Sequence, residues 1–507
     1  MSVNHRKKEF ESQINGEYTF AAVVFLLELI FGIYLGSHKV LLADAMTRTA
    51  NAFYVFWSLP RRLTSMGLMM NPLPSMLQLP FAFLSRFSRW LVTSGFSMSA
   101  VSAGFAAYGA KTLLGTFRKM GIRRKYAYLL TFLYVFNPYV FFYGANGMSE
   151  IMAATVGLQA ICSMTLWMRK GGASHLIAVA FALAILFLIR YEAVPFTILI
   201  AAGMILHLIF SRRERKYYVR DSLEPVYYVE STFWITFLPI IYTILVWIFF
   251  NWSITGDAFY FLLPYRSAVG SGDLFGTFSF VWARVWPFWI IGGALLLAKQ
   301  ISGKLLRYDT AVILFSVFGI TFFTFYMIYS GRYDGYVRYL MYPMVFAVGF
   351  IPYVLRESQN ELRSCTIVIV AAELITSLFF GWAFQRSVLF REDLLFNVPA
   401  HSEQLADYIN SRLGNKRILL DTYRTYYAVM NTENPYDLIL PCNPEFEKCL
   451  EDPIRHQVDY IIVPDITRYG RIDTVNTAWP QLYNGGESWA EEIENIGEFK
   501  VDRKSVV

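Results

Sequence analysis

The chain has 507 residues, of which 55% are apolar, 18% aromatic and only 16% charged. One soluble core cannot bury that much apolar surface, so the composition excludes an ordinary soluble protein and predicts a protein of the lipid bilayer. The formal net charge of +7 does not indicate a nucleic-acid partner, because the Lys and Arg residues occur mostly in short clusters between apolar runs, where they report membrane topology.

The first apolar run, about residues 18–38, predicts a membrane anchor near the N-terminus. It is long enough to cross a hydrocarbon core of about 30 Å as a helix. The basic flank His5-Arg6-Lys7-Lys8 precedes it and no small-residue cleavage pattern follows it, which favours an uncleaved anchor over a signal peptide. The same flank places the N-terminus in the cytoplasm.

Ten further apolar runs predict membrane helices, for a total of about eleven. They are residues 94–116, 126–145, 148–167, 174–190, 193–210, 232–250, 281–298, 310–329, 336–355 and 365–385. With a cytoplasmic N-terminus, every second short connection is basic, as the positive-inside bias requires. These connections are residues 118–125, 169–170, 212–216, 299–307 and 356–363. One span more or fewer would move the later basic clusters to the wrong side of the membrane.

The first outer loop is predicted to run from about residue 39 to residue 93. Within it, residues 72–85 are apolar but too short to span and contain three prolines, so we expect them at the membrane interface. Residues 38–57 predict a helix in the membrane plane, with one face toward the acyl chains and the other at headgroup depth. The polar face carries Asp44, Thr47, Arg48 and Asn51, and the apolar face carries Leu42, Met46, Phe53 and Phe56. An ordinary interfacial helix with a solvated polar face would show the same pattern.

Polar and aromatic side chains gather at the predicted outer ends of the later spans. They include Asn146, Ser149, Glu150, Arg190, Glu192, Trp252 and, in a single loop, Arg332, Tyr333, Asp334, Tyr336, Arg338 and Tyr339. Aromatic rings beside carboxylates suit a sugar and arginine forks suit phosphate oxygens, so the composition indicates a phosphorylated sugar. The alternative is that the aromatic residues are interfacial anchors and that Arg190 and Glu192 only cap or pair helix ends.

The position of Arg338 indicates a functional role. It is predicted just inside a span, where burying an unpartnered guanidinium costs much free energy. Other chemistries lack their motifs, since the chain has no HExxH, no Walker A loop, no Rossmann glycine fingerprint and no GxSxG elbow. The sequence therefore requires no cofactor, and a divalent metal is an option without support.

The composition changes after the last span, so residues 1–385 predict a transmembrane domain and residues 386–507 a small extracytoplasmic α/β domain. Short apolar stretches at residues 417–421 and 460–464 are typical of strands. Cys442 and Cys449 lie seven residues apart without the His partners of a zinc site, which leaves a disulfide open. The role of this domain is also left open.

The pattern resembles the GT-C superfamily of glycosyltransferases, which use polyprenyl- or dolichyl-phosphate sugars, especially its protein mannosyltransferase-like and aminoarabinose transferase-like branches. The resemblance covers nearly the whole membrane part and is carried by the N-terminal anchor, the long first outer loop and several short motifs. These motifs are residues 43–48 (ADAMTR), 71–75 (NPLPS), 136–138 (FNP), 190–192 (RYE) and 251–257 (NWSITGD). The resemblance implies an all-α polytopic membrane protein of GT-C type with an additional α/β domain. The WWDYG motif of oligosaccharyltransferases is absent, which disfavours that branch.

The resemblance also implies a mechanism. The family's first outer loop supplies an acidic catalytic base, and Asp44 is the matching position, although Ala45 follows it where many members have a second acid. The implied reaction is an inverting single displacement, in which Asp44 takes a proton from an acceptor hydroxyl while the lipid phosphate departs from the anomeric carbon.

The remaining site residues are assigned on the same basis. Arginines at the donor phosphate would stabilise its developing charge, while the other residues would bind the sugar or the acceptor. The phosphate-binding candidates are Arg338, Arg332 and Arg48, and the sugar- or acceptor-binding candidates are Glu150, Glu192, Asp334, Trp252 and Tyr333. The expected partners are a polyprenyl-phosphate-linked sugar donor, the lipid bilayer, and an acceptor that is a glycan, a lipid or a protein.

Two other functions fit a polytopic membrane protein. A carrier or flippase for a lipid-linked or small polar substrate would also have many spans, but the chain lacks the paired halves and matching interrupted helices of such proteins. A non-catalytic scaffold or sensor would need only an anchor, and the polar outer turns exceed that need.

Overall fold

The computed structural model describes residues 3–210, 224–266, 270, 272–386, 397–466 and 472–504. The chain divides into two compact units, which are described separately. The first unit consists of Met1–Ile30 and Ser102–Asp393, and the second of Phe31–Val101 and Leu394–Val507. The second unit therefore combines the first outer loop with the C-terminal segment.

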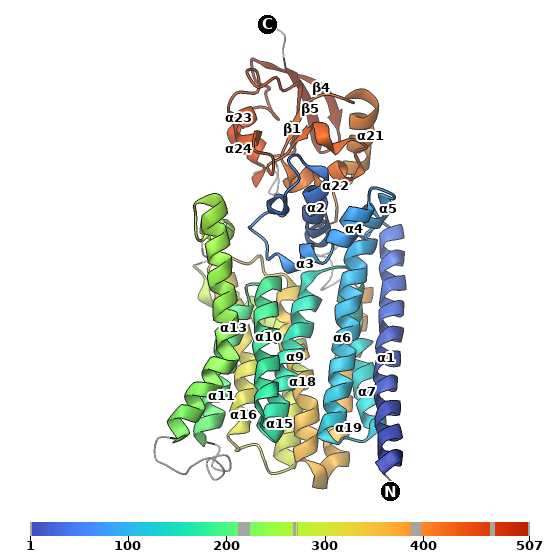
Figure 1. Ribbon diagram of the computed structural model, residues 1–507, viewed down its shortest axis with the longest axis vertical. Coiled ribbons are helices and arrows are strands. Elements are labelled where there is room, and N and C mark those ends of the chain that lie inside the picture. Colours follow the sequence, from blue (N-terminus) through green and yellow to red (C-terminus); the bar gives the residue numbers. More distant parts are fainter. Residues whose placement is uncertain are drawn as a thin grey trace. The chain divides into compact units, whose positions relative to one another are not determined.

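The first unit is a bundle of long helices that run roughly side by side (Figure 1). Two helices, α1 (Val3–Ser37) and α6 (Phe96–Met120), have most of their residues in it. The others are α7 (Arg124–Val135), α8 (Pro138–Ala145), α9 (Ser149–Lys170), α10 (Ala173–Ile189), α11 (Ala193–Phe210), α13 (Glu224–Thr255), η2 (Tyr260–Leu262), α14 (Leu263–Arg266), α15 (Leu274–Ile301), α16 (Asp309–Ile313), η3 (Leu314–Phe318), α17 (Gly319–Tyr329), η4 (Val337–Leu340), α18 (Tyr342–Glu357), η5 (Gln359–Glu361) and α19 (Leu362–Gln385).

All the runs predicted as spans are helical, but the count of eleven is not confirmed. Among the described residues, eight helices are long and apolar enough to cross a membrane. The other predicted spans are residues 94–116, 126–145 and 174–190; the last corresponds to α10, an apolar helix of 17 residues. The second is broken at Asn137-Pro138, because proline disfavours a helical residue before it and Asn137 caps α8 by accepting a hydrogen bond from the Tyr139 N–H at 3.1 Å.

The core of the first unit is formed by α9 and α18. In the most apolar window of each helix, 94% of the residues are buried, against 22% for α13 and 28% for the N-terminal anchor. A helix that is buried on all sides lies at the centre of a bundle, whereas the outer helices keep an apolar surface for lipid. The ends of α9 and α18 are therefore where polar groups can be enclosed by protein.

The second unit contains a five-stranded sheet with the order β2-β1-β3-β5-β4. Strands β2, β1 and β3 are parallel, with Ile418 beside Tyr460, and β5 and β4 are antiparallel to their neighbours. The two predicted strands are confirmed as β1 and β3. The elements are α2 (Ala43–Trp57), η1 (Leu63–Met66), α3 (Leu73–Met76), α4 (Leu79–Leu84), α5 (Trp90–Thr93), α21 (Ser402–Arg412), β1 (Ile418–Leu420), α22 (Thr422–Asn431), η6 (Pro435–Asp437), β2 (Leu438–Ile439), α23 (Phe446–Glu451), β3 (Tyr460–Pro464), α24 (Thr474–Ala478), β4 (Ala490–Ile496) and β5 (Phe499–Lys504).

Within this unit, the first outer loop is tied to the C-terminal segment along its length. The Val398 N–H donates to the Leu41 carbonyl at 3.0 Å, and the Asn443 amide donates to the Leu59 carbonyl at 2.8 Å. Arg62 donates to the Cys442 carbonyl at 2.6 Å. Cys442 and Cys449 are both free thiols, so no disulfide contributes to this unit.

The predicted helix of the first outer loop is present as α2, but its apolar face does not meet lipid. Leu42, Met46 and Phe53 are buried in the protein, at 2% exposure or less. The helix packs against α4 and η1 of its own loop and against α22 of the C-terminal segment. Hydrophobic periodicity locates an apolar face, but it does not distinguish lipid from protein as the partner of that face.

Candidate functional site

Glu150 and Arg338 meet at the ends of the two central helices. Glu150 lies in the first turn of α9 and Arg338 in η4, which leads into α18. Their side chains form an ion pair, with 3.1 Å between the Arg338 Nε and the Glu150 Oε1. Both residues are at most 3% exposed, so each charge depends on the other for its stability.

Arg190 connects this pair to Glu192. It caps the C-terminus of α10, and its guanidinium lies 2.8 Å from Glu150 Oε1 and 2.6 Å from Glu192 Oε1. It also donates to the Ser149 hydroxyl at 3.1 Å. We call Glu150, Arg190, Glu192 and Arg338 the Arg190 cluster.

Tyrosine rings cover the two guanidinium groups of the Arg190 cluster. The Arg338 guanidinium lies 4.2 Å from the ring centroid of Tyr336 and 5.2 Å from that of Tyr339, and Arg190 lies 5.3 Å from the Tyr339 centroid. Tyr333 packs on Tyr339 with 4.6 Å between centroids, and burial raises the pKa of Tyr333. Such cation–π contacts fix the planes of the guanidinium groups. They give the cluster an aromatic wall of the kind that packs against a sugar.

A small cavity lies beside the Arg190 cluster. Its lining combines two charged residues with apolar side chains from five helices: Ala153, Leu186, Arg190, Glu192, Ala193, Phe196, Ile320, Tyr342 and Phe346. The cavity has a volume of about 10 Å³, which is room for about one water molecule beside the charged groups.

The structure brings together three of the predicted site residues in the Arg190 cluster itself, Glu150, Glu192 and Arg338, with Tyr333 in its aromatic wall. Trp252 lies on α13 and is 58% exposed. Arg332 and Asp334 are exposed, and Arg332 donates to the Tyr326 hydroxyl at 3.2 Å. The predicted roles of these three residues stay predictions.

Asp44 and Arg48 belong to the second unit. Asp44 is partly buried in the first turn of α2, where the helix dipole favours a negative charge, and Arg48 follows one turn later with 8% exposure. They share a face of α2, as predicted. Among the described residues, no group of three or more His, Cys, Asp and Glu side chains could hold a metal ion.

No protein-family model and no curated protein matches the chain. Two crystal structures of ArnT from Cupriavidus metallidurans, one bound to undecaprenyl phosphate and one in the apo state, match 95% of this chain and 97% of theirs. The TM-score is 0.57 for both, at 11% and 12% sequence identity. The chain has the fold of ArnT.

The likeness to ArnT confirms the expected architecture, a multi-pass helical membrane fold with a small C-terminal sheet. The sequence identity is so low that the likeness to ArnT shows the fold alone. The side of the membrane on which each terminus lies stays a prediction.

Sequence reasoning underestimated Arg190. It named the Arg190-Tyr191-Glu192 turn but left Arg190 out of the site, because an Arg and a Glu two residues apart at a helix end form a pair without any outside partner. In the structure, Arg190 also pairs with Glu150, which lies 40 positions earlier in the chain. Arg338 pairs with the same carboxylate. The sequence did contain a signal for this cluster, because four charged residues fall at the predicted outer ends of spans, where charge is costly. They are Glu150, Arg190, Glu192 and Arg338.

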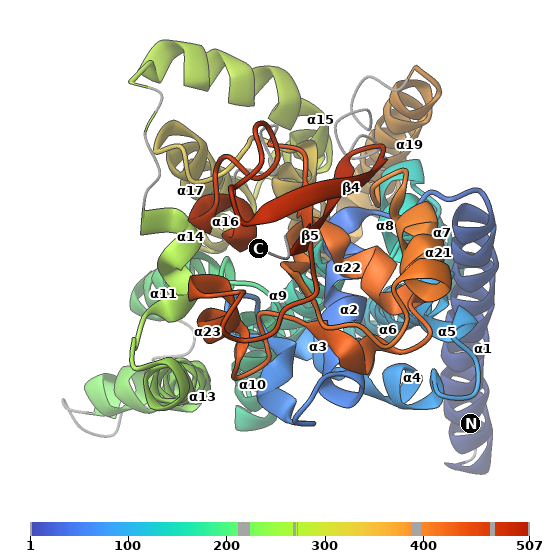
Figure 2. The same ribbon diagram turned by 90° about the horizontal axis from the view of Figure 1, so that it is seen from above.

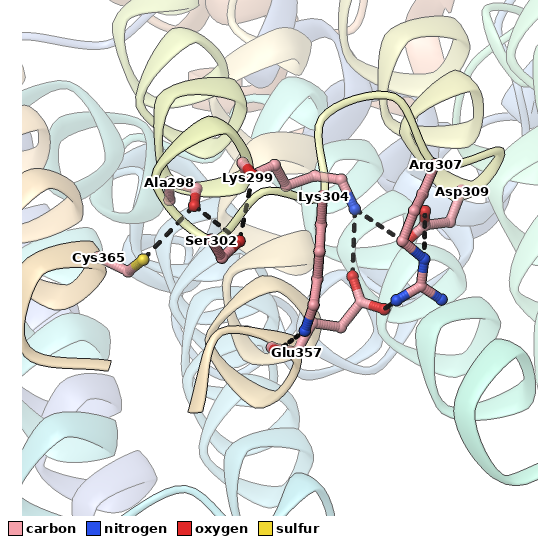
Figure 3. Close-up of polar contacts among 8 residues, drawn as sticks. All are labelled: Ala298, Lys299, Ser302, Lys304, Arg307, Asp309, Glu357 and Cys365. Atoms are coloured by element: carbon pink, nitrogen blue, oxygen red, sulfur yellow. Dashed lines mark hydrogen bonds and ion pairs between the residues drawn. The ribbon is translucent and has the colours of Figure 1, made fainter. Parts of the chain in front are cut away.

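A second buried ionic network lies at the other end of α18 (Figure 3). Lys299 is 1% exposed, and its ammonium lies 2.8 Å from Asp309 and 3.1 Å from Glu357. Arg307 reaches the other Glu357 oxygen at 2.8 Å, and the Lys304 ammonium donates to the Glu357 carbonyl. We call these five residues the Lys299 network. It joins α15, α16 and α18 at their ends.

Proposed function

We propose that this protein is a membrane glycosyltransferase that moves a sugar from a polyprenyl-phosphate-linked donor to an acceptor on the extracytoplasmic side. The observation that carries the proposal is the full-length match to the fold of ArnT, one structure of which is bound to undecaprenyl phosphate. A second support is the Arg190 cluster, which places two guanidinium groups, two carboxylates and tyrosine rings together at the ends of the central helices.

Arg338 is the proposed binding group for the donor phosphate, and Arg190 holds it in place through their shared partner Glu150. A guanidinium stays charged at every pH of interest and offers paired N–H donors to phosphate oxygens. Charge on the bridging oxygen increases as the glycosidic bond to phosphate breaks, so a fixed guanidinium stabilises the transition state more than the ground state.

The tyrosines and the remaining carboxylate serve the sugar in this proposal. Tyr333 and Tyr339 offer ring faces for packing, and Glu192 offers carboxylate oxygens to sugar hydroxyls. Three exposed residues, Trp252, Arg332 and Asp334, could reach only an outlying part of the donor or the acceptor, and Arg48 is proposed for the phosphate only as an auxiliary group.

Asp44 is the proposed general base. The acceptor oxygen attacks the anomeric carbon while the bond from that carbon to the phosphate oxygen breaks, and the acceptor proton passes to the Asp44 carboxylate. The lipid phosphate leaves with the electron pair of the broken bond, and the configuration at carbon inverts. Nothing in this step needs a metal ion, because the leaving group is already an anion that arginine can bind.

The test is the transfer of radiolabelled sugar from a panel of polyprenyl-phosphate sugars, in membranes that contain either the wild-type chain or Asp44→Asn. The substitution preserves shape and removes the base, so we expect wild-type transfer and a loss of about 100-fold or more in the variant. Equal transfer by both proteins would remove Asp44 from the mechanism. No transfer by a folded wild type across the panel would overturn the proposed function in favour of a carrier.

A further inference from the structure

The second unit has parallel strands whose carboxyl ends form one edge of the sheet. Open α/β sheets bind ligands at the carboxyl ends of their strands, at the point where the strand order reverses. Here β1 lies between β2 and β3, so the order reverses beside β1. Asp421 follows β1 directly, and its carboxylate accepts hydrogen bonds from the Tyr423 N–H at 2.9 Å and the Thr474 N–H at 2.5 Å.

This edge is occupied by the chain's own first outer loop. Helix α22, which begins beside Asp421, packs against α2, and Figures 1 and 2 both show the two helices next to each other. Tyr54 of α2 is 3% exposed, and its pKa is raised well above the usual value, first by burial and then by the acidic groups Cys442 and Asp421 of the C-terminal segment. The position that holds a ligand in other α/β sheets therefore holds the helix that carries Asp44.

Tyr426 of α22 is a member of this contact that its packing does not explain. The side chain is 2% exposed, and its hydroxyl has no hydrogen-bond partner in the part of the chain that the structure describes. A buried hydroxyl without a partner costs free energy that phenylalanine at the same place would avoid. Burial raises the pKa of Tyr426, the charge of Arg424 lowers it, and the negative charge of Asp44, on the helix α2 against which α22 packs, raises it further.

The adjacent Tyr427 shows what a structural tyrosine of the same helix looks like. Its hydroxyl lies 3.1 Å from the Thr93 carbonyl, to which it donates, and 3.3 Å from Glu403. These contacts join α22 to α5 and α21. Two consecutive tyrosines of one helix thus differ in their hydroxyl groups. The Tyr427 hydroxyl has protein partners, whereas the Tyr426 hydroxyl has none among the described residues and belongs to the helix that packs against α2, which carries Asp44.

We propose that Tyr426 is an acceptor-binding residue, supplied by the C-terminal segment, whose hydroxyl donates a hydrogen bond to an oxygen of the acceptor next to Asp44. The proposal rests on the function proposed above, because the acceptor oxygen must lie against the base that takes its proton. It also gives the C-terminal segment a role, which is to hold α2 and to bind the acceptor.

The experiment compares the purified full-length wild type with Tyr426→Phe and Tyr427→Phe. The radiolabelled donor from the panel is supplied in membranes that contain the native acceptor, and both sugar transfer and sugar release to water are counted. The melting temperature Tm of each purified protein is measured by intrinsic fluorescence. We expect Tyr426→Phe to reduce transfer about 10-fold relative to sugar release, with an unchanged or higher Tm, because it removes one hydrogen bond to the substrate and an unpaired group from the protein.

Tyr427→Phe should show the opposite pattern, a lower Tm with transfer per folded molecule within about twofold of wild type, because it loses hydrogen bonds within the protein. If Tyr426→Phe transfers sugar as well as Tyr427→Phe does, or loses activity only in proportion to a lower Tm, the acceptor role of Tyr426 is wrong while the proposed function stands. If wild type transfers no sugar, the proposed function fails, and this inference fails with it.

Discussion

The two buried ionic groups at the ends of α18 contain the same kinds of side chain and differ in what surrounds them. The Arg190 cluster has tyrosine rings centred 4.2 to 5.3 Å from its two guanidinium groups and lies beside a cavity of about 10 Å³. The Lys299 network is closed by the protein itself, since the Lys304 ammonium donates to a main-chain carbonyl and Lys299 is held between two carboxylates (Figure 3). The two groups are roughly 30 Å apart along α18.

This difference shows that buried charge alone does not identify a binding site in a membrane protein. Charges inside a bundle are expensive wherever they occur, and pairing them is sufficient to make the fold stable. What distinguishes the Arg190 cluster is its closer aromatic cover, because its guanidinium groups lie 4.2 to 5.3 Å from tyrosine ring centroids. In the Lys299 network the corresponding distances are 5.8 Å for Arg307 and 6.0 Å for Lys299. The comparison predicts that substitutions at one end change activity and substitutions at the other change stability.

The largest expected effect is at the Lys299 network. Lys299→Met leaves Asp309 and Glu357 close together in the protein without the cation between them, so we expect a loss of about 3–5 kcal/mol of unfolding free energy. Thermal unfolding of the purified protein measures the loss, and transfer per folded molecule should stay within about twofold. A stable variant with lost transfer would mean that this end of the molecule takes part in the reaction, and the comparison would fail.

Arg338→Lys should have the next largest effect, on activity. Lysine keeps the charge opposite Glu150 but lacks the planar pair of donors, so we expect transfer to fall about 100-fold with little change in Tm. The matched control is Arg307→Lys, the same exchange in the Lys299 network, which should leave transfer unchanged. Equal effects of the two exchanges would contradict a phosphate-binding role that is special to Arg338.

The aromatic wall is tested at Tyr339, whose ring lies near both Arg190 and Arg338. Tyr339→Phe keeps the ring and should keep transfer within about twofold, whereas Tyr339→Leu should reduce transfer about 10-fold because it removes the cation–π contacts. The measurement is the rate of sugar transfer by each variant at a saturating donor concentration. A phenylalanine variant as impaired as the leucine variant would assign the effect to the hydroxyl and not to the ring.

The smallest expected effect extends the comparison to a buried carboxylate of the second unit. Burial and the neighbouring charge of Asp421 raise the pKa of Asp473 to about 8, so the folded protein binds a proton there that the unfolded chain releases near pH 4. Because the folded state binds more protons in this window, wild-type stability should decrease as the pH rises from about 4 to about 8.

Asp473→Asn removes this dependence and retains the cap of α24, since asparagine is as good an N-cap as aspartate. The Tm of the variant relative to wild type should therefore rise between pH 5 and pH 8. A constant difference across these pH values would show that Asp473 is already ionised in the folded protein at pH 5.

The sequence by itself determined where the helices run, and it placed the polar residues at their ends. Hydrophobic runs are local properties of the chain, and the cost of leaving backbone polar groups unpaired in lipid makes each of them helical whatever surrounds it. The same local reasoning located α2 and its polar face, strands β1 and β3, and the concentration of charge that became the Arg190 cluster. It did not settle the number of spans, because α10 is short and one predicted span is broken at Asn137-Pro138.

Only the tertiary structure decided which of these groups meet. Arg190 and Arg338 are 148 positions apart in the chain and share one carboxylate, and the apolar face of α2 is buried against a helix that lies about 380 residues later. No periodicity encodes such contacts, because they depend on how the helices pack and not on the sequence spacing within any one of them. For the same reason the sequence left the role of the C-terminal segment open, whereas its fold sets α22, and with it Tyr426, against the helix that carries Asp44.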